Sequence, residues 1–232
     1  MYFSTSAIEN INDSKKRWIV VGLALKDLVD QIRSFVKKKV LKDYDNLRTS
    51  HGIDSQSSSS RLESRGFTFL KYENINGNNA LPKLRDGKFD YAEFDYRVMS
   101  HVDYAKLYLQ DYMTKFTVFD EHCDASAVLN LLVRVPVFSR TVQKAAESVG
   151  NDRNAWAHPV FQDWNSGKFQ QCFQDMETLA NALGLPRGGG YSQKNWVGVC
   201  GPLPKTLTLF MTKICDFPYP IYDQTKNLIP YL

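Results

Sequence analysis

The chain has 232 residues, of which 43% are apolar and 23% charged, a composition typical of a globular protein with a sizeable core. Its 29 Lys and Arg residues against 25 Asp and Glu give a net charge of +4, which excludes a strongly basic nucleic-acid coat but not a local basic surface. No apolar run approaches the roughly 20 residues of a membrane helix. The N-terminus also lacks the pattern of a secretory signal peptide. We therefore expect a cytoplasmic protein, with a nuclear location as the alternative.

The placement of the cysteines and the absence of common catalytic motifs exclude several kinds of functional site. The cysteines (Cys123, Cys172, Cys200 and Cys215) are far apart and form no CxxC pair, which favours reduced thiols over a disulfide framework. His122 and Cys123 are adjacent and diverge on a helix, so they do not make a metal site by themselves. The GxSxG, GxxxxGK[ST], GxGxxG and HExxH patterns are absent. We expect neither a metal nor a cofactor.

The first half of the chain begins with the clearest helical pattern. Apolar residues recur every three or four positions from about Ser14 to Leu47, which predicts a long amphipathic helix. The run 37–39 (KKK) lies on its polar side, as a solvated face or, alternatively, as an RNA contact. Residues 48–94 are expected to form a loop and irregular excursion, with a mobile serine-rich stretch over 49–66 and one short strand-like piece, FTFLKY. Helical spacing resumes over 95–117.

The second half contains three predicted helices. Asp124 is a plausible N-cap for a helix that begins at Ala125 and is stopped by Pro136. Ser139 caps the next helix, which continues into the hexapeptide RNAWAH. A last helix begins at 165 or 166 and ends at Gly184. Its spacing predicts one apolar stripe that faces the core: Phe169, Cys172, Phe173, Met176, Leu179, Ala180 and Leu183. The chain thus divides into an N-terminal segment over 1–13, a helical domain over 14–184, and a Pro/Gly-rich tail or linker over 185–232.

RNAWAH, at 153–158, is the strongest candidate for a functional site. In a helix, Asn154 and His158 are four residues apart and lie on one face. Arg153 points elsewhere, but its long side chain can swing toward the same groove. Pro159 disfavours helix at His158, so the imidazole is expected at the helix C-terminus. A guanidinium that holds a phosphate oxygen beside an imidazole that moves protons suits phosphodiester chemistry.

The same residues carry a family resemblance. An Arg, a polar residue, three more residues and a His, late in a helical domain and before one last amphipathic helix, resemble the HEPN superfamily of helical ribonucleases and RNA-associated modules. The stretch is most similar to HEPN domains of large animal proteins that also contain ubiquitin-ligase or death-fold modules. The resemblance covers about 17–183 and rests on RWIVVGLALKDLV, CDASAVLNLL, and RNAWAH followed by FQQCFQDMETL.

The resemblance implies an all-α, up-and-down helical bundle that forms a homodimer, with the two motifs facing one composite cleft. It also implies metal-independent cleavage of RNA, in which the 2′-hydroxyl attacks its own phosphate and leaves a 2′,3′-cyclic phosphate. His158 would then act as general base or acid, Arg153 would stabilise the phosphorane, and Asn154 would orient one of them. Asp124 is a possible accessory residue, although helix capping is the simpler role.

Each of these residues also has a structural interpretation. Arg153 can pair with Asp152 or Glu147 while His158 only caps a helix, and Asn154 can serve as a local backbone hydrogen-bonder. Trp156 can stack on a base or pack against a neighbouring helix or protomer. Cations near the motif can contact RNA phosphates or remain solvated; these are Arg134, Arg140 and Lys144.

Two functional hypotheses follow, with a third behind them. The first is a dimeric endoribonuclease of a defence or RNA-turnover system. The second is a non-catalytic HEPN-like module for dimerisation or for binding RNA or protein, with the tail as a further protein contact. The third is a helical adaptor unrelated to RNA.

Overall fold

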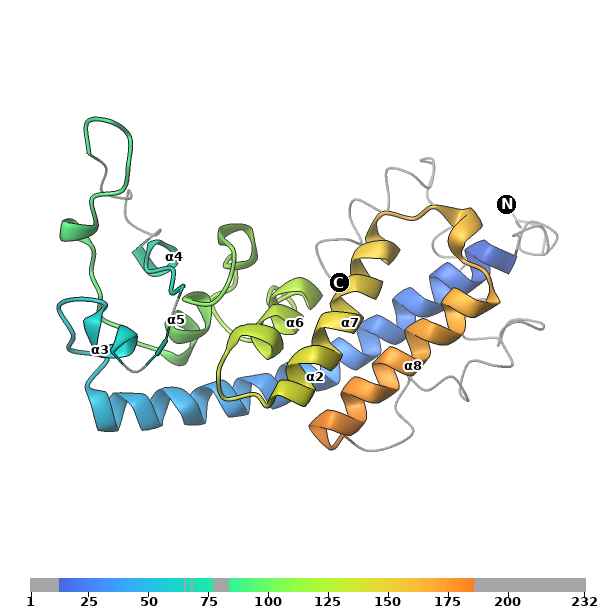
Figure 1. Ribbon diagram of the computed structural model, residues 1–232, viewed down its shortest axis with the longest axis horizontal. Coiled ribbons are helices and arrows are strands. Elements are labelled where there is room, and N and C mark those ends of the chain that lie inside the picture. The colour runs from blue at the N-terminus through green and yellow to red at the C-terminus, as the bar shows by residue number, and fades with distance from the viewer. Residues whose placement is uncertain (1–12, 65, 68, 77–83, 186–232) are drawn as a thin grey trace, which may run out of the picture. The chain divides into compact units, whose positions relative to one another are not determined.

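Helices are the regular secondary structure of the part of the chain that the computed structural model describes, residues 13–64, 66–67, 69–76 and 84–185 (Figure 1). No β-strand occurs in these residues, so the all-α prediction is confirmed. The N-terminal segment and the tail fall outside this range except for their boundary residues 13 and 185. No helix in the described ranges is long and apolar enough to cross a membrane.

The chain divides into two compact units. The terminal unit comprises residues 1–30 and 144–232, and the central unit comprises residues 31–143. Helices α2 (Asp13–His51) and α7 (Arg140–Ala157) each contribute to both units. That residues 14–184 form one domain remains a prediction.

The terminal unit is a bundle of three helical segments: the first part of α2, most of α7, and α8 (Ser166–Leu183). The short η3 (Phe161–Asp163) connects α7 to α8. Asn165 caps α8 by accepting a hydrogen bond from the Lys168 N–H at 3.0 Å. Gly184 ends α8 in the left-handed conformation, with φ of 68°. The predicted apolar stripe of α8 is buried in full: Phe169, Cys172, Phe173, Met176, Leu179, Ala180 and Leu183.

A pair of tryptophans joins α2 to α7 in the terminal unit. The indoles of Trp18 and Trp156 stack with centroids 5.3 Å apart and planes 11° apart. Each indole N–H donates to the other residue's backbone carbonyl, at 2.8 Å from Trp18 and 2.9 Å from Trp156. Both residues are buried. Gly22 makes this approach possible, because a Cβ there would lie 2.5 Å from the Trp156 Nε1.

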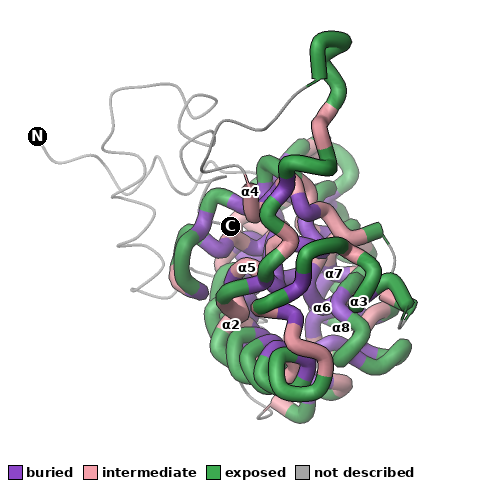
Figure 2. The backbone as a smooth tube through the Cα atoms, turned by 90° about the vertical axis from the view of Figure 1, so that its left-hand side faces the viewer, coloured by how far each residue is buried: buried purple, intermediate pink, exposed green. Residues whose placement is uncertain are grey.

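The central unit is less regular. Its helices are the second part of α2, α3 (Ser60–Glu63), α4 (Glu73–Asn76), α5 (His101–Lys106) and α6 (Ala125–Arg134), with 3₁₀ turns η1 (Tyr91–Glu93) and η2 (Asp111–Met113). Figure 2 shows buried and exposed positions interleaved along the helices, as amphipathic packing requires. The side of α2 that faces this unit's core carries Ile32, Val36, Val40 and Tyr44.

The later helices confirm their predicted boundaries, whereas the middle of the chain differs. Asp124 caps α6 through a 2.8 Å bond from the Ala127 N–H, and the Ser139 Oγ accepts from Val142 at 3.4 Å at the start of α7. The helix predicted over 95–117 is wrong except for α5 and η2. The Asp95 carboxylate accepts from the Arg97 N–H at 3.0 Å, a local bond that competes with helical bonding.

The serine-rich stretch over 49–66 is not the mobile loop that its composition predicts, because its described residues pack within the central unit. Ile53, Gln56 and Leu62 are all buried, and α3 forms within the stretch. Gln56 donates to the Tyr72 hydroxyl at 3.0 Å and to the Tyr96 carbonyl at 2.7 Å. The sequence did not predict this packing, because three buried side chains at irregular spacing produce no helical or strand periodicity.

Replacing Gly22 by Ala should destabilise the protein by about 1–3 kcal/mol, because the new methyl group overlaps the Trp156 indole. Gly150→Ala is the matched control, since Gly150 also lies in a helix but has nothing within 4 Å of its Cβ position. The control should gain about 0.5–1 kcal/mol from helix propensity. Urea unfolding measures both changes. Equal stability of the two variants would show that the tryptophan pair does not require this close approach.

Candidate functional site

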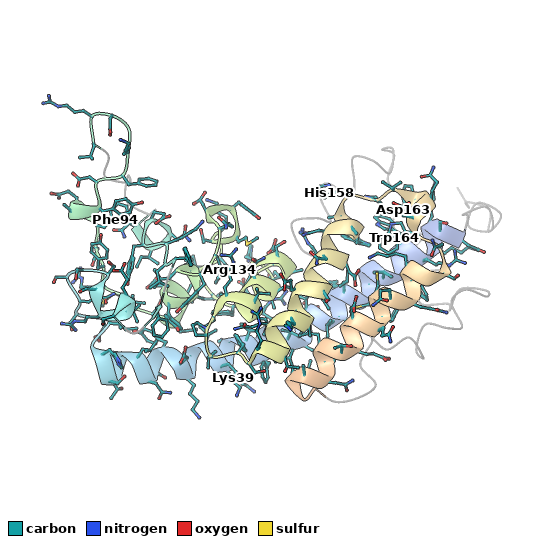
Figure 3. The ribbon with its side chains drawn as sticks, in the orientation of Figure 1. Lys39, Phe94, Arg134, His158, Asp163 and Trp164 are labelled. Carbon is teal, nitrogen blue, oxygen red and sulfur yellow. The ribbon has the colours of Figure 1, made fainter. Side chains whose placement is uncertain are left out.

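The residues of RNAWAH lie at the C-terminal end of α7, in the terminal unit. The helix ends at Ala157, and the His158 N–H still bonds the Asn154 carbonyl at 3.2 Å, so the last turn closes on His158. The side chains of Asn154 and His158 are exposed to solvent. Figure 3 shows His158 at the end of α7, followed by Asp163 and Trp164 on the connection to α8. The predicted placement of the imidazole at the helix terminus is confirmed.

Arg153 is half-buried, and the hydrogen-bonding state of its guanidinium is unusual. Its Nη1 donates to the Asn154 Oδ1 at 3.4 Å, a long bond. Its Nε is buried and has no acceptor among the residues that the structure describes. No ion pair joins Arg153 to a carboxylate of any described residue, and Asp152 pairs with Lys168 instead. The structural interpretation in which Asp152 or Glu147 neutralises Arg153 is therefore wrong.

Asn154 contacts Arg153 through its side chain and His158 through its backbone. Its side-chain oxygen accepts from Arg153, and its backbone oxygen accepts from the His158 N–H. No hydrogen bond joins the guanidinium directly to the imidazole. Three polar groups, which we call the polar row, therefore lie at one helix end: the guanidinium and the carboxamide are in contact, and the imidazole is joined to them only through the backbone. Asn154 and His158 are exposed to solvent.

Trp156 lies inside the motif but is not part of this polar row. Only 5% of it is exposed, one face of its ring stacks on Trp18, and its N–H bonds a backbone carbonyl. Its expected contact with an RNA base is therefore contradicted, and the packing alternative holds. A second ring, Phe161, lies edge-on to Trp18 with centroids 5.6 Å apart. Within the motif, Trp156 thus anchors the helix to α2, while Asn154 and His158 are exposed to solvent.

The other residues predicted for the site form no hydrogen bond or ion pair with the motif in the described part of the chain: Asp124, Arg134, Arg140 and Lys144. Asp124 belongs to the central unit, where it caps α6. Arg134 and Arg140 are exposed residues of the same unit, and the Arg140 Nη1 donates to Gln143 at 3.3 Å. Lys144 is an exposed residue of the terminal unit. Their contact with RNA stays a prediction.

A buried acidic group behind the motif was missed by sequence reasoning. Asp152 is 3% exposed, and its Oδ1 accepts from the Lys168 Nζ at 2.6 Å, which ties α7 to α8. Its Oδ2 is buried without a hydrogen-bond partner. Sequence contained the signal, because Asp152 continues the apolar spacing of α7 (Val142, Ala145, Val149, Trp156). A carboxylate at such a position needs a buried partner.

Other ionisable groups of α8 respond to Asp152. Burial opposes the charge of Lys168, but the hydrogen bond and the charge of Asp152 outweigh it and raise the pKa of that ammonium. Burial, and then the charge of Asp152, raise the pKa of Asp175 above its usual value. Burial raises the pKa of the Cys172 thiol to about 12, with Asp152 adding to the shift. Cys172 is thus an unreactive thiol of the core, as expected for its apolar stripe.

One exposed group could hold a metal ion. Asp120, Glu121 and His122 place ligand atoms within 4.8 Å of one another. The Asp120 carboxylate already accepts from the His122 N–H at 3.0 Å and lies 3.2 Å from its Nδ1. The neighbouring Cys123 is buried and does not join them, since burial raises the pKa of its thiol to about 12. The contacts between Asp120 and His122 explain why these side chains cluster: they stabilise the turn that precedes α6.

Comparisons of the chain with protein-family models, with curated proteins and with solved structures find no match. The resemblance to HEPN domains therefore rests on the residues of this chain alone.

Replacing Lys168 by Ala should destabilise the protein by about 2–4 kcal/mol, because it leaves the Asp152 carboxylate buried and unpaired. The figure stays below that of a fully buried pair, since the Lys168 side chain is 32% exposed. Lys26→Ala is the matched control. Lys26 forms a 2.7 Å pair with Asp30 whose side chains are 53% and 42% exposed, and its loss should change stability by about 0.5 kcal/mol. Denaturant unfolding compares them, and Asp152→Asn should restore part of the loss in Lys168→Ala.

The stability of the protein should also depend on Asp175. Because its pKa is raised in the folded state, its contribution is complete below about pH 4 and is lost as pH rises through the folded pKa. Asp175→Asn, which is neutral at every pH, should therefore become progressively more stable relative to the native chain between pH 4 and pH 7. Asp163→Asn, at an exposed carboxyl, serves as control. A constant difference between Asp175→Asn and the native chain across this range would contradict the assignment.

Proposed function

We propose that this protein is a metal-independent endoribonuclease of the HEPN type. The observation that carries the proposal is the half-buried Arg153, whose charge no carboxylate of a described residue neutralises. A guanidinium that no carboxylate neutralises can bind an anionic oxygen through its remaining N–H groups, and such charge-assisted hydrogen bonds are strong. A phosphate of RNA is such an anion, and the exposed Asn154 and His158 lie beside the same helix end.

The chemistry assigns one task to each residue of the row. The RNA 2′-oxygen attacks the adjacent phosphorus while its proton passes to an imidazole that acts as general base. The phosphorane that forms carries extra negative charge, which Arg153 stabilises. The bond from phosphorus to the 5′-oxygen then breaks, and a general acid supplies a proton to that oxygen. The products are a 2′,3′-cyclic phosphate and a 5′-hydroxyl.

Asn154 and a second protomer complete this proposal. The Asn154 side-chain oxygen accepts a long hydrogen bond from the Arg153 guanidinium at 3.4 Å, and in this proposal Asn154 helps to orient the positive charge. One chain carries a single imidazole in the motif, whereas cleavage needs both a base and an acid. A homodimer that pairs two copies of the motif supplies His158 twice, once in each role. The proposed enzyme is accordingly a dimer that acts on RNA.

Incubation of the full chain with single-stranded RNA in EDTA should produce fragments with 2′,3′-cyclic phosphate ends. His158→Ala should lower the cleavage rate by about 10²–10⁴-fold, through loss of proton transfer. Arg153→Ala should lower it by about 10²–10³-fold, through loss of charge stabilisation. Arg97→Ala, which removes an exposed arginine paired with Asp95, should leave the rate unchanged.

Two outcomes would overturn the proposal. Cleavage that persists in both motif variants would remove these residues from the reaction. Absence of cyclic-phosphate products at every RNA length, with a dimer still seen by light scattering, would instead support the non-catalytic interaction module.

A further inference from the structure

The first half of the α2 segment in the central unit, residues 31–42, carries charge of one sign, and Asp43 and Asp45 follow it. Residues 31–42 contain five cations and no acidic residue. Arg33 serves the fold, since its Nε donates to the Cys123 carbonyl at 3.0 Å. The other four cations are exposed, and no carboxylate within the described ranges pairs with them: Lys37, Lys38, Lys39 and Lys42.

Helix geometry places these lysines on the side of α2 that the core does not use. At 100° per residue, Lys38 and Lys42 are one turn apart near the middle of the exposed side, and the other two flank them. The opposite side carries Val36 and Val40, which are fully buried. Lys39, labelled on α2 in Figure 3, places its Nζ 5.6 Å from the centroid of the Phe35 ring.

This lysine face works against the stability of its own helix. Like charges four residues apart repel, and acidic residues at these positions would have relieved the repulsion. The fold gains no ion pair from these four side chains. A partner that carries negative charge would remove the repulsion, so the face has the charge of a binding surface for a polyanion.

We propose that the lysine face of α2 (Lys37, Lys38, Lys39 and Lys42) binds the phosphate backbone of RNA. The choice of RNA among polyanions rests on the proposed function, whereas the charge argument does not. A membrane surface fits less well, because amphipathic helices insert an apolar side and that side of α2 is in the core. A protein partner also fits less well, because lysine is depleted at the centres of protein interfaces. Lysine contacts to phosphate give affinity without sequence preference.

Fluorescence anisotropy with a labelled 20-nucleotide oligo(U) RNA, titrated at several salt concentrations, tests the proposal. The full chain should be used in a His158→Ala background, so that binding is measured without cleavage. Lys38→Gln/Lys42→Gln should weaken binding about tenfold and reduce the slope of log affinity against log salt by about 1.4, the value for two lost phosphate contacts on a single strand. Thermal unfolding should show no loss of stability.

The matched control is Lys88→Gln/Lys115→Gln, which removes the same charge from exposed lysines of the same unit. It should leave the salt slope unchanged. An equal effect of both double variants would overturn the proposal, because binding would then follow net charge alone. Equally tight, Lys38/Lys42-dependent binding of phosphatidylserine vesicles or of poly-glutamate would also overturn it. Failure of RNA cleavage with an intact lysine-dependent slope would remove the proposed enzyme but leave this surface in place.

Discussion

The stacked pair of Trp18 and Trp156 is the interaction on which the candidate site depends. Each indole satisfies its N–H on the other residue's carbonyl, so two large side chains are buried without an unpaired donor. The carbonyl of Trp156 belongs to the last turn of α7, which is the turn that carries Asn154 and ends at His158. The pair therefore fixes the end of α7 that carries the polar groups. Gly22 of α2 allows the close approach, because it has no Cβ to overlap the Trp156 indole.

A second contact, from Asp152 to Lys168, holds the same helix to α8 and carries a different physical constraint. It buries a carboxylate of which only one oxygen has a hydrogen-bond partner among the described residues. Burial and then the Asp152 charge raise the pKa of Asp175, while the hydrogen bond to Asp152 raises the pKa of Lys168 against the effect of burial. The tryptophan pair and the ion pair flank Arg153 in sequence. Arg153 thus lies between two anchored residues, and no carboxylate of a described residue pairs with it. Anchored surroundings around an unsatisfied cation are what preorganised anion binding requires.

Periodicity predicted the regular helices well, because each buries one face. The whole apolar stripe of α8, the cap at Asp124 and the helix terminus at His158 were all readable in this way. The central unit resisted the same reasoning. Val98, Leu107 and Leu109 are buried there by irregular backbone, so their spacing resembled a helix that does not form. Trp156 shows the corresponding limit at the site, since an aromatic residue in a motif is compatible with stacking on a base and with packing on Trp18.

Sequence by itself determined the all-α class, the long first helix, and the polar triplet of Arg153, Asn154 and His158 at a helix end, because local spacing and capping decide these features. Only the tertiary structure decided which charges are neutralised. Among the residues that it describes, it paired Asp152 with Lys168, left Arg153 without a carboxylate, and left the lysine face of α2 without an ion pair. The reason is physical: whether a charge is solvated, paired or orphaned depends on burial and on partners distant in the chain, and no local pattern encodes those distances.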